Sequence, residues 1–447
     1  MISAIASQLA EHLKVDSGHV SDSVFCTRIE ERLNHPVISL EAAEGTPLFS
    51  NEELSILRCK TDEHIMIANF TPKLRDLCRE AGLEFVNTEE WEWIQVQHGK
   101  AGNEMKPDGS SSLPGLFIPQ RVAPNMEDIR DPTGNFFFGQ PVWKVRDMYF
   151  IWEFKCHITP RDRGKAYSNL SHLSHDDKVN IYTCVLGDND GFVCTTMQRG
   201  VVLTNEAAPW TMTGSKQYLL KQLCRFVARN PWVSSLRELC VEHELKVIGF
   251  LGSGSYGRCF KVRTASGLER ALKLVLVASQ ENPPLVLTLV SNELKHLKEE
   301  LSGFPNVVKV ESDSLIKVTD SEKVVAVGYL MSEVGIPLEA SECQNRETLK
   351  HILSSLMALH REGYYHGDAR LTNVLRKVGG GYMWIDFMVF GVAADFIGLQ
   401  KEDMRSLIAS VFGSSACAKV ARVLGVAGNY SAVPEDIEAI VLSLCEV

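Results

Sequence analysis

Two short segments decide the fold of the C-terminal half: His366-Gly367-Asp368-Ala369-Arg370-Leu371-Thr372-Asn373 and, after a turn, Trp384-Ile385-Asp386-Phe387. They supply an acid, an asparagine five residues later, and a second acid at the end of a short apolar strand. Asp368 is suited to accept a proton from an attacking hydroxyl, while Asn373 and Asp386 hold Mg²⁺ against the phosphates of ATP. Magnesium prefers hard oxygen ligands and keeps part of its water shell, so few side chains are needed. An isolated HGD would instead be a turn with a capping aspartate.

A glycine-rich loop lies upstream of these segments. The strand Val247–Leu251 runs into Gly252-Ser253-Gly254-Ser255-Tyr256-Gly257, and a second strand follows directly at Arg258–Arg263. A dinucleotide-binding fold would place a helix after such a loop. We therefore expect a β-hairpin whose three glycines lie over the phosphates of a nucleotide.

The next strand, Arg270–Leu276, carries Lys273 among apolar residues. A lysine in an apolar strand is costly without a partner. The helix expected over Val290–Leu301 offers Glu293 beside apolar neighbours, and we expect this carboxylate to pair with Lys273 and help bind ATP. Glu299 and Glu300 are the alternatives.

Two further strands, expected at 307–310 and 324–330, lead to Met331-Ser332-Glu333, where a hinge that holds the adenine would fall. An amphipathic helix then delivers the HGD loop; its apolar face is Leu349, Ile352, Leu353, Leu356 and Leu359. The order of glycine loop, strand lysine, helix glutamate, HGDxxxxN and strand-end aspartate predicts an ATP-binding kinase fold.

This half resembles the eukaryotic-type protein kinases, with departures. Gly367 replaces the arginine that commonly precedes the catalytic aspartate, Asp386-Phe387-Met388 replaces DFG, and Cys259 replaces a valine. No APE-like motif follows. Asp403 either matches the buried aspartate that braces the catalytic loop of kinases or is an acid at a helix N-terminus. The resemblance implies a domain over 240–447, with an N-lobe at 245–335 and a C-lobe at 336–447. It also implies that Lys273 anchors ATP and that Asp368 is the catalytic base.

The N-terminal half contains a second group of charged residues. Tyr149–Lys155 is a strong strand, in which Glu153 and Lys155 are two apart and point to the same face. An isolated pair of this kind is usually a surface ion pair. Pro107-Asp108 lies upstream, however, and two carboxylates on one edge can bind a divalent cation that activates water. Lys155 would then stabilise the hydroxide and the charge that develops on phosphorus.

This PD…ExK arrangement resembles the restriction-endonuclease superfamily. The resemblance implies that Asp108 and Glu153 are metal ligands, that Lys155 is catalytic, and that an acid on an upstream helix completes the site. Glu30, Glu31 and Glu80 are the candidates for that acid. The expected nuclease-like domain covers 86–232, with a strand over 90–97, a loop over 104–109 and a hairpin around 186–191. It follows a helical region over 1–85, with helices expected over 2–13, 23–33 and 72–81.

Three cations follow the strand, at Arg161, Arg163 and Lys165. Cations beside a metal-binding edge suit a phosphate backbone, which dominates nucleic-acid affinity. A solvated run of charge is the alternative.

The composition is that of an ordinary globular chain with two or three domains: 447 residues, 45% hydrophobic and 23% charged. A net charge of −10 argues against a surface coated uniformly for nucleic acid. No apolar run approaches the roughly 20 residues that span a bilayer, and no secretory signal is visible. We therefore expect no membrane partner. The 12 cysteines lack zinc-site spacing and predict a reducing, intracellular setting.

The combination of the two halves resembles the C-terminal effector region of Crinkler proteins over about residues 85–400. The resemblance implies an α/β plus α+β fold, with a restriction-endonuclease-like α/β/α core followed by a bilobal protein-kinase-like domain. It also implies a Mg²⁺-dependent DNA endonuclease, a Ser/Thr kinase acting on itself or a protein partner, and a site of action in the host nucleus. The alternative is a non-cleaving DNA-binding scaffold whose kinase-like domain only binds ATP.

Overall fold

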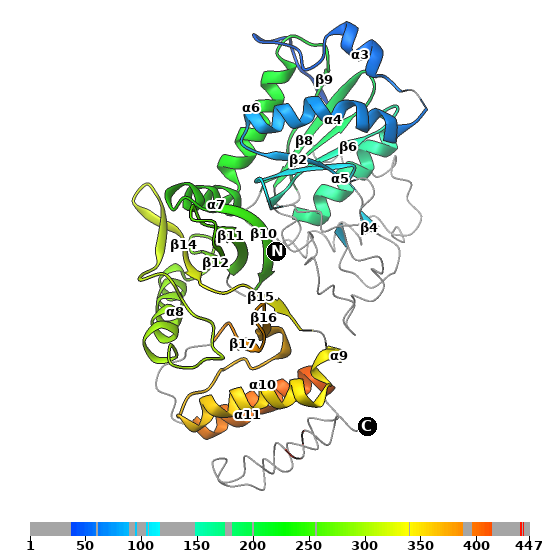
Figure 1. The fold of residues 1–447 in the computed structure, drawn as a ribbon. Helices are drawn as coiled ribbons and strands as arrows, with labels where there is room; N and C mark the ends of the chain where they lie inside the picture. The colour runs from blue at the N-terminus through cyan, green and yellow to red at the C-terminus, as the bar shows by residue number, and fades with distance from the viewer. Residues whose placement is uncertain are drawn as a thin grey trace, which may run out of the picture. The chain divides into compact units, whose positions relative to one another are not determined.

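The computed structural model describes residues 37–59, 61–88, 94–95, 104–105, 107–116, 148–174, 181–198, 201–254, 257–338, 340–387, 396–413, 439 and 441. The chain divides into two compact units (Figure 1). Unit 1 comprises Met1–Phe117 and Pro141–Arg237, and unit 2 comprises Ile118–Gln140 and Glu238–Val447. The helices expected over 2–13 and 23–33 lie outside the described residues.

Unit 1 is built on a mixed seven-stranded sheet in the order β1-β9-β8-β7-β6-β5-β2. Its strands are β1 Ile38–Ser39, β2 Glu84–Asn87, β5 Gly109–Ser112, β6 Phe150–Phe154, β7 Tyr182–Gly187, β8 Gly191–Gln198 and β9 Val201–Pro209. The β6–β7 and β1–β9 pairs are parallel and the others are antiparallel. Every residue of β6 and β7 is buried, so both faces of the central strands are covered. The hairpin expected around 186–191 is confirmed by the β7–β8 pairing.

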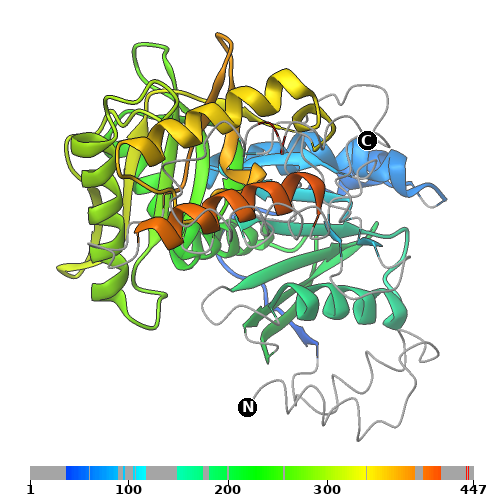
Figure 2. The same cartoon turned by 90° about the horizontal axis from the view of Figure 1, so that it is seen from below.

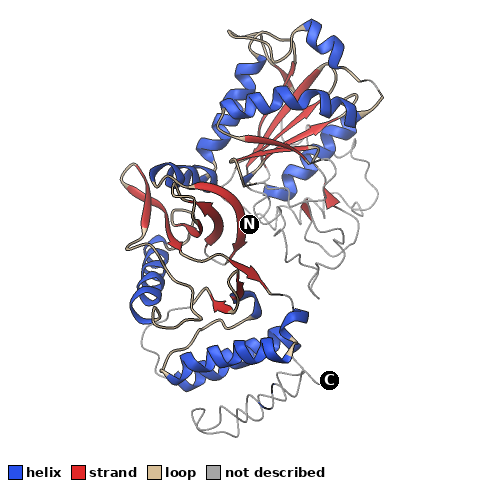
Figure 3. Ribbon diagram, viewed as in Figure 1, coloured by secondary structure: helices blue, strands red, loops and turns tan. Residues whose placement is uncertain are grey.

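The helices assigned to the N-terminal half are α3 Asn51–Leu57, α4 Glu63–Glu80, α5 Pro160–Ser174, α6 Ser215–Arg229 and α7 Pro231–Glu242. α5 packs on β7 and β8, while α4 packs on β2 and α6. Phe70 of α4 meets Phe154 of β6 edge-on at 6.1 Å, and Phe226 of α6 meets Phe150 at 5.9 Å. Aromatic side chains thus attach α4 and α6 to the strand that precedes Lys155. Figure 3 shows the helices in blue and the strands in red.

The start of α4 differs from the expectation of a helix over Pro72–Ala81. The side chain of Asp62 accepts a hydrogen bond from the Ile65 amide and caps a helix that begins at Glu63, with Pro72 in its interior. An interior proline removes one helical hydrogen bond. The helix continues because an apolar face on both sides of the proline is buried: Met66, Ile67, Phe70, Leu74 and Leu77.

The segment before Asp108 also differs from a plain loop. Glu104–Met105 forms β4, which pairs with β3 Ile94–Gln95, the described part of the strand expected at 90–97. Gly109 begins β5, so Asp108 lies at the entrance to a sheet strand.

Unit 2 begins with a five-stranded antiparallel sheet in the order β10-β11-β12-β14-β13. Its strands are β10 Lys246–Ser253, β11 Gly257–Arg263, β12 Glu269–Leu276, β13 Ile316–Asp320 and β14 Lys323–Met331. The helix α8 Pro283–Lys295 follows β12 and ends in a π-helical turn, His296–Glu300. The expectation of a strand directly after the glycine loop is confirmed by the β10–β11 hairpin.

The strand expected at 307–310 is wrong. Val307 and Val310 form only isolated bridges, with Trp384 and Met331 respectively, and the missing strand is β13. The segment 307–310 resembles a strand in sequence because both valines are apolar. They are held by two different neighbours rather than by one continuous partner.

The rest of unit 2 combines helices with a small sheet. The described elements are α9 Ala340–Cys343, α10 Arg346–Arg361, α11 Phe396–Phe412 and the strands β15 Gly335–Pro337, β16 Val374–Lys377 and β17 Tyr382–Trp384. Figure 2 shows α10 in yellow and α11 in orange-red. Trp384 is buried and donates from Nε1 to Ser355 Oγ of α10 at 2.8 Å, which attaches the small sheet to that helix.

Among the described residues, no helix combines the length and the apolar character that crossing a bilayer requires.

Candidate functional site

Lys273 is the centre of a charged cluster in unit 2. It lies on β12 between Cys259 of β11 and Tyr329 of β14. Its Nζ is 2.6 Å from Glu293 Oε1 and 2.7 Å from Asp386 Oδ1. Burial by itself would lower the pKa of Lys273, but these carboxylates raise it well above the usual value. The ammonium therefore stays charged in an interior position.

The helix α8 brings Glu293 to this lysine. Asn282 caps the helix by accepting from the Leu285 amide, and the buried Val290 and Leu294 fix which face turns inward. The alternative partners are used elsewhere, since Glu299 pairs with Lys295 at 3.8 Å and Glu300 with His296 at 2.9 Å. The structure therefore places Glu293 against Lys273.

Asp386 joins the cluster in an unusual backbone conformation. Its φ is +61°, in the left-handed region that non-glycine residues rarely adopt. Burial by itself would raise the pKa of Asp386, but Lys273 holds it below the usual value. A Cβ placed on Gly254 would lie 3.5 Å from Asp386 Oδ2, so Gly254 lies close to this carboxylate.

Asp368 and Asn373 form the second part of the site. Asn373 Nδ2 donates to the backbone oxygen of Asp368 at 2.8 Å and to its Oδ2 at 3.0 Å. Arg370 also donates to Asp368 Oδ2, at 2.5 Å. Arg370 was not predicted to contact Asp368, although its place two residues after that aspartate in the sequence could have suggested the contact. The loop thus presents an acid, an amide and a guanidinium together.

A buried aspartate holds this loop in shape. Asp403 lies in the interior of α11, which excludes the interpretation as an N-terminal helix acid. Its carboxylate accepts from the amides of His366 at 2.6 Å and Gly367 at 2.8 Å, and lies 3.2 Å from His360 Nε2. The His366 ring stacks on Phe387 at 4.3 Å, which links the loop to the segment after Asp386.

Replacement of Asp403 by Ala is expected to lower the free energy of unfolding of unit 2 by about 3–5 kcal/mol, because two buried amides lose their acceptor. Thermal or urea denaturation measures this loss. Glu402→Ala is the matched control, since Glu402 makes only an exposed pair with Arg405 at 3.4 Å. Equal stability of the two variants would contradict the role of Asp403.

The glycines of the loop have different steric surroundings. A Cβ on Gly257 would lie 2.8 Å from both Leu274 O and Val275 Cγ2, whereas a Cβ on Gly252 would meet nothing within 4 Å. We expect Gly257→Ala to destabilise unit 2 by about 1–3 kcal/mol through this clash, and Gly252→Ala to change stability little. Denaturation of the two variants measures the difference, and a Gly257→Ala variant as stable as Gly252→Ala would contradict it.

Glu333 is not part of the cluster around Lys273. It follows β14, and its Oε2 lies 3.3 Å from Lys377 Nζ. Its expected role in nucleotide binding therefore stays a prediction.

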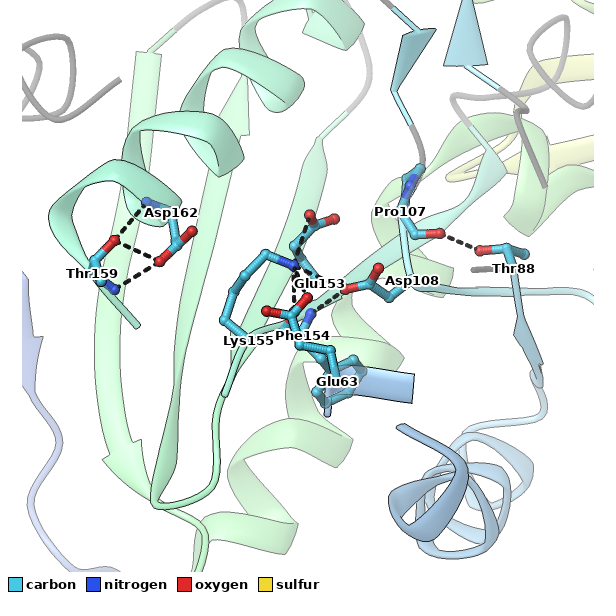
Figure 4. Close-up of polar contacts among 9 residues, drawn as sticks. All are labelled: Glu63, Thr88, Pro107, Asp108, Glu153, Phe154, Lys155, Thr159 and Asp162. Carbon is cyan, nitrogen blue, oxygen red and sulfur yellow. Dashed lines mark hydrogen bonds and ion pairs between the residues drawn. The ribbon is translucent and has the colours of Figure 1, made fainter. Parts of the chain in front are cut away.

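A second charged cluster lies in unit 1, around Lys155 (Figure 4). Lys155 Nζ is 3.1 Å from Glu63 Oε2 and 3.6 Å from both Asp108 Oδ2 and Glu153 Oε1. Asp108 Oδ2 accepts from the Phe154 amide at 2.6 Å, which ties the loop to β6. The three residues expected from the PD…ExK pattern are thus brought together.

The charge balance of this cluster favours a cation. Glu153 is 2% exposed and Lys155 15% at the side chain. Burial by itself would lower the pKa of Lys155, but Asp108, Glu153 and Glu63 raise it above the usual value. Three carboxylates therefore share one ammonium.

The upstream acid of this cluster is Glu63, which the sequence did not identify. Glu30 and Glu31 lie outside the described residues. Glu80 is at the opposite end of α4 and pairs with Lys216 at 2.5 Å, so that candidate is wrong. Glu63 was not predicted as the upstream acid because its helix was expected to begin only at Pro72.

The three cations that follow β6 all belong to the helix α5. Arg161 and Arg163 lie in the first turns of α5, and the side chain of Lys165 is outside the described residues. Their expected contact with nucleic acid stays a prediction.

The donor atoms of both clusters fit Mg²⁺. Within the described part of the chain, no three His, Cys, Asp or Glu side chains form a ready-made metal site. In unit 1 the carboxylates already surround a positive group, and carboxylate oxygens are what Mg²⁺ prefers. In unit 2 Asp386 and Asn373 supply two oxygens, which suffices where nucleotide phosphates add the rest.

Comparisons with known proteins find that part of this chain is similar in sequence to kinases. The chain is 32% identical over 151 residues to cyclin-dependent kinase 4 of Xenopus laevis, which covers 31% of this chain and 46% of that protein. It is 22% identical over 154 residues to NUAK family SNF1-like kinase 2 of Rattus norvegicus, which covers 33% of this chain and 23% of that protein. The chain thus spans less than half the length of these relatives.

Among solved structures, a MAP kinase from Leishmania major matches with 16% identity and a TM-score of 0.30, over 40% of this chain and 58% of that one. No protein-family model matches the chain. With the Lys273–Glu293 pair and the HGDxxxxN loop, the two curated relatives identify a protein-kinase-like domain in this chain.

Proposed function

We propose that unit 2 binds ATP with Mg²⁺ and transfers the γ-phosphoryl group to a serine or threonine hydroxyl, on this chain or on a protein partner. The observation that carries this proposal is the Lys273–Glu293–Asp386 cluster, with Nζ–O distances of 2.6 and 2.7 Å and with Gly254 close to Asp386. Kinases use such a lysine for the ATP phosphates and such an aspartate for the metal.

Each residue has a distinct chemical role in this proposal. Asn373 and Asp386 would hold Mg²⁺, which neutralises phosphate charge when bound. Asp368 orients the acceptor hydroxyl and takes its proton as the oxygen–phosphorus bond forms and ADP leaves. Arg370, at 2.5 Å from Asp368, places positive charge beside that carboxylate and near the transferred group.

Nucleotide binding tests the first step. ATP with Mg²⁺ at about 100 times its Kd should stabilise the wild type by about 2.7 kcal/mol, and Lys273→Met should lose most of this shift. Lys261→Met is the control, because Lys261 pairs instead with Glu269, whose side chain is 40% exposed. An unchanged shift in Lys273→Met would contradict the role of the lysine.

We also propose that unit 1 has a restriction-endonuclease-like core and cleaves DNA with Mg²⁺. The observation that supports this is the convergence of Glu63, Asp108 and Glu153 on Lys155 within 3.1–3.6 Å. The carboxylates would hold the metal, whose chemistry is to activate a water and shield the phosphodiester. Lys155 would stabilise the charge that develops on phosphorus.

Incubation with supercoiled plasmid tests this second activity. We expect the wild type to nick the plasmid with Mg²⁺ and to stop when EDTA is added. Intact plasmid under both conditions would overturn the nuclease proposal and leave that of unit 2 untouched.

From these two proposed activities, in this order along the chain, we further propose a Crinkler-type effector that acts on DNA in a host nucleus. A tagged chain expressed in a eukaryotic cell should then accumulate in the nucleus. The alternative is a DNA-binding scaffold with an ATP-binding domain. It is favoured by the Lys155 ammonium, which already lies 3.1–3.6 Å from the three carboxylates and offsets one of their three charges. DNA binding without nicking would support that alternative.

A further inference from the structure

Two cysteines flank the charged cluster of unit 1. Cys59 lies between α3 and α4, four residues before Glu63, and Cys156 directly follows Lys155. Both are free thiols of intermediate exposure. They are 97 positions apart in the sequence, so their proximity is produced by the fold alone.

A single buried side chain joins the two cysteine backbones. Asn189, in the turn between β7 and β8, donates from Nδ2 to the Cys59 and Cys156 oxygens, at 2.9 Å each. Its Oδ1 accepts from the Cys59 amide at 3.0 Å. Because each carbonyl oxygen is 2.9 Å from the same nitrogen, the two oxygens lie at most twice that distance, 5.8 Å, apart.

The Cys156 thiol is affected by the charged cluster. Burial raises the pKa of Cys156, and the charges of Glu63, Cys59 and Asp62 raise it further against the opposing effect of Lys155. Because one side chain bonds both backbones, Cys59 and Cys156 are neighbours in the fold. A disulfide between them requires Cα atoms about 4.4–6.8 Å apart.

We propose that Cys59 and Cys156 form a reversible disulfide, with Asn189 as the residue that holds them in register. The oxidant is a small disulfide such as oxidised glutathione. One cysteine thiolate attacks it, forms a mixed disulfide and releases one glutathione thiolate. The second cysteine then attacks the protein sulfur and releases the other. The chain loses two electrons and two protons, and two glutathione thiols form.

This bond would connect the start of α4 to the end of β6, and so tie Glu63 to Lys155. The described arrangement already has these residues together, at 3.1 Å between Glu63 Oε2 and Lys155 Nζ. Oxidation therefore preserves the cluster rather than rearranging it. That the bond would hold a nuclease site together rests on the nuclease proposal, whereas formation of the bond does not.

The test is a non-reducing digest of the full chain after incubation with oxidised or reduced glutathione at mildly alkaline pH. Mass spectrometry should find the Cys59 and Cys156 peptides linked only in the oxidised sample, and the melting temperature should rise by about 5 °C or more. Cys59→Ser and Cys156→Ser should each abolish both effects. Cys224→Ser is the control, because Cys224 is an exposed thiol on α6.

Asn189→Asp tests the role of the amide, because it keeps the size of the side chain and removes both donors. We expect it to reduce the yield of the linked peptide several-fold. If Cys224 takes up glutathione while Cys59 and Cys156 stay unlinked, the proposal is overturned. A linked peptide in a protein that never nicks plasmid would instead overturn only the nuclease proposal.

Discussion

Asp368→Asn should reduce phosphoryl transfer from ATP by about 10³-fold, the usual contribution of a positioned general base. The amide keeps the size of the side chain and its contact with Asn373 but cannot accept the hydroxyl proton. ATP binding should change little, because the Lys273 cluster is separate from this side chain in its contacts. Transfer is measured with labelled ATP, and binding by the nucleotide-induced shift in melting temperature.

Glu347→Gln is a suitable control for that experiment, since Glu347 lies in the first turn of α10, away from the HGD loop in sequence. Full transfer by Asp368→Asn would show that another group takes the proton. Loss of both transfer and ATP binding would show instead that the variant has lost its fold.

Lys155→Ala should reduce plasmid nicking by about 10²–10³-fold, because it removes the one ammonium that three carboxylates share. Without that charge, Glu153 is left buried beside two other acids. We therefore expect the variant to be less stable than the wild type without metal and to regain stability with Mg²⁺. Nicking is followed on a gel, and stability by thermal denaturation.

Lys216→Ala is the matched control for Lys155→Ala, because Lys216 pairs with Glu80 at the other end of α4. The same comparison separates the two acids of that helix: Glu63→Gln should weaken nicking, and Glu80→Gln should not. Equal activity of Glu63→Gln and Glu80→Gln would contradict the placement of Glu63 in the site.

The residues around Lys273 were predictable because each belongs to a short local pattern. The glycine loop between two strands, the lysine in an apolar strand and the HGDxxxxN loop are readable over a few residues. Glu293 was predictable because a buried lysine requires a carboxylate and the next helix offers one on its apolar face. The role of Arg370 needed the geometry of the loop, since its contact with Asp368 depends on backbone conformation.

The residues that the sequence did not reveal depend on contacts between distant segments. Glu63 reaches Lys155 from 92 positions away, and Pro72 hid the start of its helix. Asn189 looked like an ordinary turn residue, yet it joins segments 130 and 33 positions away. Val307 and Val310 resembled a strand because local pattern shows burial but not the partner. A single sequence gives little information on which distant residues contact one another.

The most direct test of the central claim is transfer of label from γ-labelled ATP by the wild-type chain with Mg²⁺, with and without a protein acceptor such as casein. The Lys273, Glu293, Asp386 and Asp368 arrangement predicts label on serine or threonine, lost when EDTA is added. ATP that binds and stabilises unit 2 but transfers no label to either acceptor would contradict the claim, and would leave a kinase-like domain that only binds its nucleotide.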